Sequence, residues 1–169
     1  MPISIFFTLI LALLLGMFSY FKPTESAKGV AENVPLFELD HFVIYEITPH
    51  KISHSFTGDH GAKFQDYYDA TNAKLTNNKR ELLESIQADH AIYQGDVINL
   101  KGNVHYVRED GLEFRSHEGI YDQKNSFAKT KGAFTITKDQ HSVRGTQLYY
   151  DLAHDTVDAN QITGIYQLN

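Results

Sequence analysis

Residues 86–93 read Ile86-Gln-Ala-Asp-His-Ala-Ile-Tyr93, and this stretch decides the fold because its pattern recurs in three other places. The other copies are Phe56-Thr-Gly-Asp-His-Gly-Ala-Lys63, Phe114-Arg-Ser-His-Glu-Gly-Ile-Tyr121 and Val143-Arg-Gly-Thr-Gln-Leu-Tyr-Tyr150, with starts separated by 30, 28 and 29 residues. The first position is always apolar and the third always small, the sixth is small in three copies, and the eighth is Tyr in the last three. This spacing predicts stacked structural repeats.

A glycine follows each of the last three copies, inside a stretch where apolar and polar residues alternate. Around Gly102 the apolar positions are Ile98, Leu100, Val104 and Tyr106. This period of two indicates a half-buried strand. We therefore expect Gly102, Gly132 and Gly164 to be bulges or points of close approach within strands, and 109–111 and 138–140 to be hairpin turns.

One repeat of roughly 28 residues then holds two strands, and the predicted fold class is all-β. A two-stranded unit cannot bury its own apolar face, so the units must stack into one continuous, folded-over sheet. The segment Asn78–Asp89 competes with this interpretation because its composition favours a helix. We follow the repeat, and hence a strand, from Ile86 onward and leave Glu81–Glu84 open.

The first 21 residues differ from the rest of the chain. No charged residue occurs from Pro2 to Phe21, and about 20 apolar residues in a helix cross a hydrocarbon core of roughly 30 Å. The run is longer than the apolar region of a signal peptide, and no good cleavage site follows it. We expect a retained transmembrane helix at 1–21 with a cytoplasmic N-terminus, a flexible tether at 22–35 and a separate domain at 36–169.

The composition excludes several classes of function. The 169 residues include no cysteine, which removes disulfides, thiol catalysis and cysteine-based zinc sites. The formal charge of −6 argues against nucleic-acid binding, because neutralising phosphates needs a basic face. The nine histidines lack a recognised metal spacing, and acidic pairs such as Asp66/Asp69 fall where turn residues belong. We predict neither enzymatic activity nor a metal or other cofactor.

The order of these stretches resembles one family. Behind the apolar N-terminus come 86–93, Val97-Ile-Asn-Leu-Lys-Gly-Asn-Val-His-Tyr106, Gly111-Leu-Glu-Phe-Arg-Ser116, Tyr121-Asp122 and Val143-Arg-Gly-Thr-Gln-Leu-Tyr-Tyr-Asp151. Together they are similar to the LptC family, the bitopic component of lipopolysaccharide export, best from about 85 to 166. The resemblance implies a twisted, open β-jellyroll, similar to LptA, anchored in the inner membrane and facing the periplasm.

The resemblance also implies a function in outer-membrane biogenesis. Proteins of that family accept lipopolysaccharide extracted from the inner membrane by an ABC transporter and pass it to a soluble, LptA-like periplasmic protein of the same fold. Acyl chains travel in the apolar interior, and the folds join through edge strands, which unpaired sheet edges invite. By analogy, Phe37–Ile47 would face the transporter and Ile162–Leu168 the acceptor. Gly132 and Gly145 match family glycines that fix the backbone.

Alternation assigns the inward face, and hence the candidate lipid-binding residues, to Phe56, Ile86, Ile98, Leu100, Val104, Tyr106, Phe114, Phe134, Ile136, Val143 and Ile162. A slip of one residue would turn all of them outward. Basic side chains that could serve a head group at a rim are Lys101, Arg108, Arg115, Lys129, Lys131 and Arg144. Periodicity does not separate an open interior from a packed one. The alternatives are an anchored periplasmic scaffold with a closed core and a secreted bridge protein with a cleaved signal.

Overall fold

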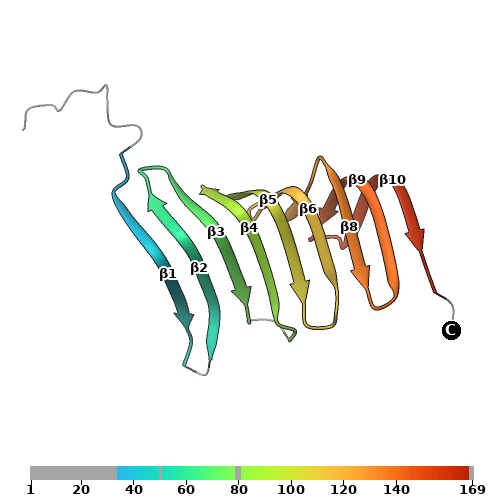
Figure 1. Cartoon of the computed structure of the whole chain (residues 1–169), viewed down its shortest axis with the longest axis horizontal. Helices are drawn as coiled ribbons and strands as arrows, with labels where there is room; N and C mark the ends of the chain where they lie inside the picture. The colour runs from blue at the N-terminus through green and yellow to red at the C-terminus, as the bar shows by residue number, and fades with distance from the viewer. Residues whose placement is uncertain (1–33, 50, 79–80, 168–169) are drawn as a thin grey trace, which may run out of the picture. The chain divides into compact units, whose positions relative to one another are not determined.

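The computed structural model describes residues 34–49, 51–78 and 81–167, which form ten strands in one antiparallel sheet (Figure 1). The strands are β1 (Phe37–Ile47), β2 (Ile52–Lys63), β3 (Tyr67–Asn77), β4 (Glu84–Gln94), β5 (Val97–Arg108), β6 (Glu113–Asp122), β7 (Phe127–Lys129), β8 (Ala133–Lys138), β9 (His141–Asp151) and β10 (Thr156–Ile165). The predicted all-β class is confirmed.

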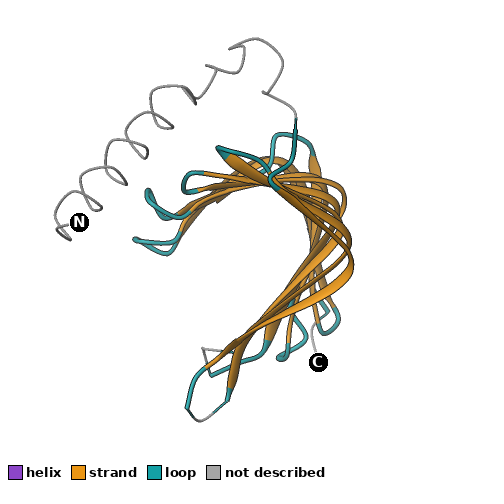
Figure 2. Cartoon of the chain, turned by 90° about the vertical axis from the view of Figure 1, so that its left-hand side faces the viewer, coloured by secondary structure: helices purple, strands orange, loops and turns teal. Residues whose placement is uncertain are grey.

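The sheet is open, because neither edge is paired within the described residues. Strands follow one another in sequence order, and β7 and β8 share one position because both pair with β6 and β9. Seen along the sheet, the strands curve into an arch that is open on one side (Figure 2). The edge strands β1 and β10 pair only with β2 and β9, respectively.

The four copies of the repeat occupy equivalent strands. They lie on β2, β4, β6 and β9, which run in the same direction with one strand position between successive copies. β4 includes Ile86, as the repeat predicts, and the local helical signal is overridden because residues 81–83 form a bend and coil. The turns expected at 109–111 and 138–140 connect β5 to β6 and β8 to β9.

A bend crosses the middle of the sheet. Residues with left-handed backbone conformations mark it on several strands: His41, Asn72, Asn103, Gln147 and Gln161. Asparagine tolerates this conformation better than most residues. The Nδ2 of Asn72 donates to Asp59 Oδ2 at 2.6 Å, and the Nδ2 of Asn103 donates to Asp89 Oδ2 at 2.8 Å. These side-chain bonds link neighbouring strands where the bend interrupts the regular ladder.

The three glycines expected within strands, Gly102, Gly132 and Gly164, differ in their roles. Gly102 has a φ of +71° beside a register shift, and a β-carbon there would meet the carboxylate of Asp89, so it is the expected bulge. Gly164 lies in β10, with only the Tyr166 ring near its missing β-carbon. The prediction that Gly132 lies within a strand is wrong, because the chain breaks between β7 and β8 where Thr130 N–H bonds the carbonyl of Leu148.

The predicted transmembrane helix at 1–21 and most of the predicted tether, 22–33, lie outside the described residues. Within the ranges that are described, no helix is long and apolar enough to cross a membrane.

Candidate functional site

The concave face of the sheet lines an apolar groove of about 1030 Å³ that extends from Phe37 on β1 to Val157 on β10. The pairing registers align its side chains in rows that cross the strands. Each row sits at one height along the strands, so the groove changes character from one end of the strands to the other.

The floor lies at the bend and is built from small residues. Ala73 pairs with Ala88 across β3 and β4, and Ala70 pairs with Ala91. The row that contains Ala70 and Ala91 continues through Leu100 on β5 to Gly119 on β6. These positions include the third and sixth residues of the repeat. Their small side chains leave open the space that larger ones would fill.

Branched and aromatic apolar residues form the next row. Register joins them in the order Ile44, Phe56, Leu75, Ile86, Tyr106, Phe114 and Ile136. Every member lines the groove. This row and the floor together give a continuous hydrocarbon-like surface, on which removal of an apolar ligand from water is favourable.

The row at one end of the strands is polar, and we call it the charged rim. Its members are Glu46, His54, Asn77, Glu84, Arg108, Lys138 and His141. Arg108 donates to both oxygens of Asp110 at 2.8 and 2.9 Å, and Lys138 Nζ donates to Asp110 Oδ2 at 2.7 Å. Hydrogen bonds from these two cations hold the pKa of the Asp110 carboxyl well below its usual range.

The row at the other end is aromatic, and we call it the tyrosine rim. Its members are Phe37, Lys63, Tyr68, Tyr93, Ile98, Tyr121, Ala128, Tyr150 and Val157. All of them except Lys63 line the groove. The last residue of each repeat copy falls in this row, at Lys63, Tyr93, Tyr121 and Tyr150. The eighth position of the repeat therefore indicated these rim residues in the sequence, although the alternation of apolar and polar residues alone did not place them in the groove.

Eight of the eleven candidate lipid-binding residues line the groove: Phe56, Ile86, Ile98, Leu100, Val104, Tyr106, Phe114 and Ile136. The structure thus brings together the candidates on β2, β4, β5, β6 and β8. That they contact lipid stays a prediction. Sequence reasoning missed the alanines of the floor and the tyrosines, whose side chains line the same groove.

Phe134, Val143 and Ile162 are not among the groove-lining residues. The ring of Phe134 packs onto Gly145, where a β-carbon would come within 2.9 Å of it, and is 4% exposed. Val143 pairs with Ile136 and Gly164 at the far side of the sheet. Ile162 lies on the edge strand and is 59% exposed. The candidate residues therefore stop lining the groove at Phe134, which is buried against the neighbouring strand, and at Ile162, which lies on the edge of the sheet.

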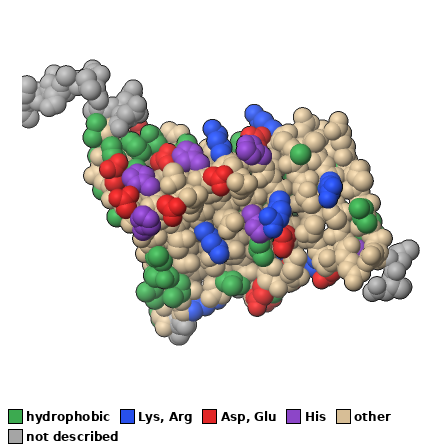
Figure 3. Space-filling model, in the orientation of Figure 1, with side chains coloured by type: hydrophobic (Ala, Val, Ile, Leu, Met, Phe, Trp, Pro, Cys, Tyr) green, Lys and Arg blue, Asp and Glu red, His purple; other side chains and the backbone are tan. Residues whose placement is uncertain are grey.

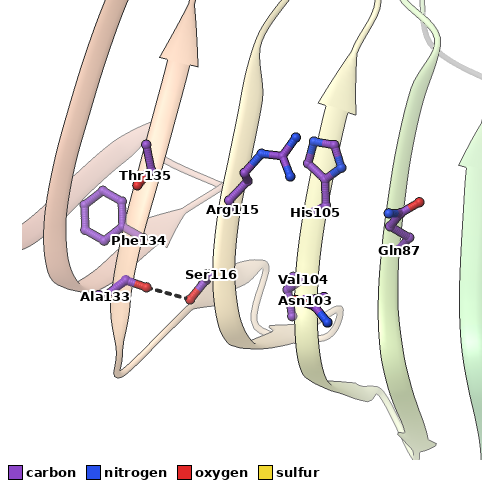
Figure 4. A pocket seen from close by; sticks show the side chains of 9 residues that line it. All are labelled: Gln87, Asn103, Val104, His105, Arg115, Ser116, Ala133, Phe134 and Thr135. Carbon is purple, nitrogen blue, oxygen red and sulfur yellow. Dashed lines mark hydrogen bonds between the residues drawn. The ribbon is translucent and has the colours of Figure 1, made fainter.

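A second, smaller hollow of about 450 Å³ lies at the bend. Figure 4 shows Gln87, His105 and Arg115 on adjacent strands of this hollow, with the Phe134 ring nearby. Arg115 and His105 both contact Glu113 Oε2, each at 3.2 Å, and Ser116 Oγ donates to the Ala133 carbonyl at 3.0 Å. The hollow is polar and internally paired, so it does not extend the apolar groove.

The outer face carries scattered charge. Acidic and histidine side chains gather over the N-terminal strands (Figure 3). His60 Nδ1 lies 2.8 Å from Asp40 Oδ1, and this hydrogen bond raises the pKa of His60 above its usual value. Of the basic candidates for head-group contact, Lys129 and Arg108 line the groove. Among the described residues, no three histidine, aspartate or glutamate side chains form a group that could hold a metal ion.

These features define a class of protein: an open, folded-over antiparallel sheet whose concave face forms an apolar slot between unpaired edges. A sequence profile described as "Lipopolysaccharide-assembly, LptC-related" matches residues 7–167. The chain belongs to the LptC-related family. It is a non-enzymatic component of lipopolysaccharide transport.

Among solved structures, the chain is similar to LptH, the LptA-homologous periplasmic component of the lipopolysaccharide transport device from Pseudomonas aeruginosa. The TM-score is 0.44 at 9% identity, over 82% of this chain and 99% of that one. Comparison with curated proteins found no match.

Proposed function

We propose that this protein is a membrane-tethered lipopolysaccharide carrier. It accepts lipopolysaccharide extracted from the inner membrane by an ABC transporter, holds the acyl chains in the groove and passes the molecule to a soluble periplasmic protein of the same fold. The observation that carries the proposal is the apolar groove of about 1030 Å³, open along one side of the sheet. Membership of the LptC-related family supports the cargo.

The groove has the chemistry that acyl chains need. Its floor of alanine and glycine provides room, and its row of branched residues provides apolar contact. Each CH₂ group removed from water contributes about 0.8 kcal/mol. Because the side of the sheet stays open, a bulky head group can remain in water while its chains slide along the slot. An open groove also favours a carrier over a scaffold with a closed core.

The two sheet edges suit transfer between folds. β1 presents exposed apolar residues beside its unpaired backbone, among them Val43, Ile44 and Tyr45. β10 presents Val157, Ile162 and Ile165 in the same way. An unpaired strand can add to the sheet of another protein, and adjoining sheets would extend one groove into the next. We assign the β1 edge to the transporter side and the β10 edge to the periplasmic acceptor.

We further propose that residues 1–21 are a retained transmembrane anchor. The family match begins at residue 7, within the apolar run, which supports a segment that is part of the working protein. The intact mass of the purified protein tests this proposal. A chain that retains Met1 to Phe21 supports the anchor, and a chain that begins after residue 21 would make the protein a secreted bridge.

Photo-crosslinking tests the carrier function. Phe114 lines the groove, whereas its neighbour Arg115 has a side chain that is 61% exposed on the outer face. Full-length chains with benzoylphenylalanine at either position are irradiated in inner-membrane vesicles that contain the transporter and ATP. We expect a lipopolysaccharide adduct from position 114 at least tenfold stronger than from 115, and a weaker adduct when ATP is omitted.

Position 115 is the matched control, because the two residues share a strand and differ only in the face they occupy. Equal labelling from both positions would show that lipopolysaccharide does not use the groove. No adduct from position 114, in a chain that retains its β-sheet circular dichroism, would overturn the carrier proposal and favour the scaffold.

A further inference from the structure

The two rims of the groove offer different chemistry to an amphiphile. At the tyrosine rim, the rings of Tyr68 and Tyr93 stack with centroids 6.0 Å apart, and Lys63 Nζ lies 3.9 Å from the Tyr68 ring centroid. Tyr68 is 47% and Tyr93 37% exposed. The rings therefore border both the apolar slot and water. Tyrosine suits such boundaries because its body is apolar and its hydroxyl needs a polar partner.

The same rim carries cations and polar groups farther along the sheet. Lys129 lines the groove, with its Nζ 5.1 Å from the Phe127 ring centroid. The Tyr150 hydroxyl donates to Asp155 Oδ1 at 2.8 Å, so this carboxylate is already engaged. Asp122 is held in the adjoining turn, where it accepts from the backbone and side chain of Asn125. Lys63 thus lies in the rim row and Lys129 lies beside it, next to Ala128, while these two carboxylates are held by neighbours.

The charged rim is bonded to itself. Glu84 accepts from Asn77 Nδ2 at 2.9 Å and from the Tyr106 hydroxyl at 2.6 Å. Asp110 binds both Arg108 and Lys138, which uses these cations internally. Glu46 lies in the same row and contacts His54 at 2.7 Å. A rim whose cations already face carboxylates offers little to an anionic head group.

We propose that the tyrosine rim binds the sugar of a glycolipid head group, with Lys63 and Lys129 facing the anionic substituents of that sugar, and that the acyl chains point from there across the floor toward the charged rim. This assignment rests on the proposed function, because it takes a glycolipid as the cargo. It gives the bound molecule one direction in the groove.

The chemistry of the two rows supports this direction. Tyrosine rings offer flat apolar surface to the C–H faces of a sugar, and their hydroxyls both donate and accept hydrogen bonds. Lysine presents a flexible point charge that binds phosphate. Between the rims, the floor and the row from Ile44 to Ile136 hold no charged side chain, which matches hydrocarbon. Along each strand, the lining of the groove therefore changes from the amphipathic tyrosine rim to an apolar middle, beyond which the charged rim lies.

Crosslinking followed by chemical cleavage of the adduct tests the direction. Gln123 and Leu112 line the groove beside the tyrosine rim and the charged rim, respectively. Each is replaced by benzoylphenylalanine in the full-length chain, which is mixed with purified lipopolysaccharide in nanodiscs and irradiated. Hydrolysis that severs acyl chains from sugar then precedes mass spectrometry. We expect the peptide with position 123 to keep a sugar mass and the peptide with position 112 to keep a fatty-acyl mass.

The outcomes separate the two proposals. Reversed masses, or the same kind of adduct at both positions, would overturn the direction but leave the carrier function standing. Absence of adducts at 112, 123 and 114 alike would overturn the carrier function itself.

Substitution of the tyrosines gives a second, independent readout. With the crosslinker at position 114, Tyr93→Leu and Tyr121→Leu are expected to lower the lipopolysaccharide adduct at least fivefold and to change the adduct with a sugar-free phospholipid less than twofold. Tyr149→Leu is the control, because Tyr149 is not among the groove-lining residues. An equal fall for both lipids would show that the tyrosines act only as apolar wall.

Discussion

One row of cross-strand pairs runs through the bend of the sheet, and its residues differ in size between the middle of the groove floor and the two sides. At the sides, a phenylalanine on one strand pairs with a glycine on the next: Phe42 with Gly58, and Phe134 with Gly145. In the middle, Ala73 pairs with Ala88. At the sides a phenylalanine ring packs over a glycine, whereas in the middle both members of the pair carry only a methyl group.

This difference teaches how one repeat makes both a core and a cavity. The rings of Phe42 and Phe134 lie where a β-carbon on the opposing glycine would be 2.8 to 2.9 Å away, so ring and glycine are matched in size. Ala73 and Ala88 are buried too, Ala73 in a cluster with Phe42 and Ala88 in a cluster with Leu100 and Val104, but their own side chains are small. We therefore expect the large rings at the sides to contribute more to stability, residue for residue, than the alanines of the middle, whose small size leaves more of the groove to a ligand.

The largest expected effect is on stability, from Phe134→Ala. This ring is 4% exposed and packs on both Gly145 and Phe114. Truncating a buried phenylalanine typically costs about 3–5 kcal/mol, and we expect a loss in the free energy of unfolding of this size by urea denaturation. Phe37→Ala is the control, because Phe37 is 52% exposed. Equal losses from both substitutions would contradict the view that the side of the floor is a packed core.

A pair of glycine substitutions sharpens the comparison with a smaller effect. At Gly145 an added β-carbon would meet the Phe134 ring at 2.9 Å and the Asn160 carbonyl oxygen at 3.0 Å, so Gly145→Ala should cost about 1–3 kcal/mol. At Gly119 the nearest atom would be Val104 Cγ1 at 3.7 Å, an ordinary contact. Because alanine also restricts the unfolded chain, we expect Gly119→Ala to be neutral or to stabilise by up to about 1 kcal/mol.

Both variants are measured by urea denaturation of the full-length chain. The prediction concerns their difference, which removes errors common to both measurements. If Gly145→Ala were as well tolerated as Gly119→Ala, the Phe134 ring would have room to move. The side of the floor would then resemble the middle.

The repeat made the strands predictable, because its small residues recur wherever the sheet bends. Alternation also selected residues that line the groove across the centre, where strands such as β4 and β5 are long and paired on both sides. Toward the C-terminal side, Phe134 and Ile162 are not among the groove-lining residues, for two physical reasons. The break between β7 and β8 lets Phe134 close the fold, and β10 is an edge whose Ile162 has no outer neighbour to cover it.

The rims were less predictable than the floor. Tyr93, Tyr121 and Tyr150 were visible as the last residue of three repeat copies, but the sequence does not say which strand ends meet. Only the register places them in one row with Tyr68, which belongs to no copy and pairs with Tyr93. The charged rim likewise depends on contacts such as Tyr106 with Glu84, which are 22 residues apart in the chain.

The smallest expected change in stability is the most informative about the cavity, and it comes from Ala91→Leu. Ala91 lines the groove and pairs with Ala70, so a larger side chain can extend into open space. Overpacking a dense core costs about 1–3 kcal/mol, whereas we expect less than about 1 kcal/mol here. The crosslinked lipopolysaccharide at position 114 should nevertheless fall severalfold, because the leucine occupies space meant for acyl chains. A loss of about 3 kcal/mol with unchanged crosslinking would mean that the alanine pairs, like the Phe134–Gly145 pair, sit in a filled core.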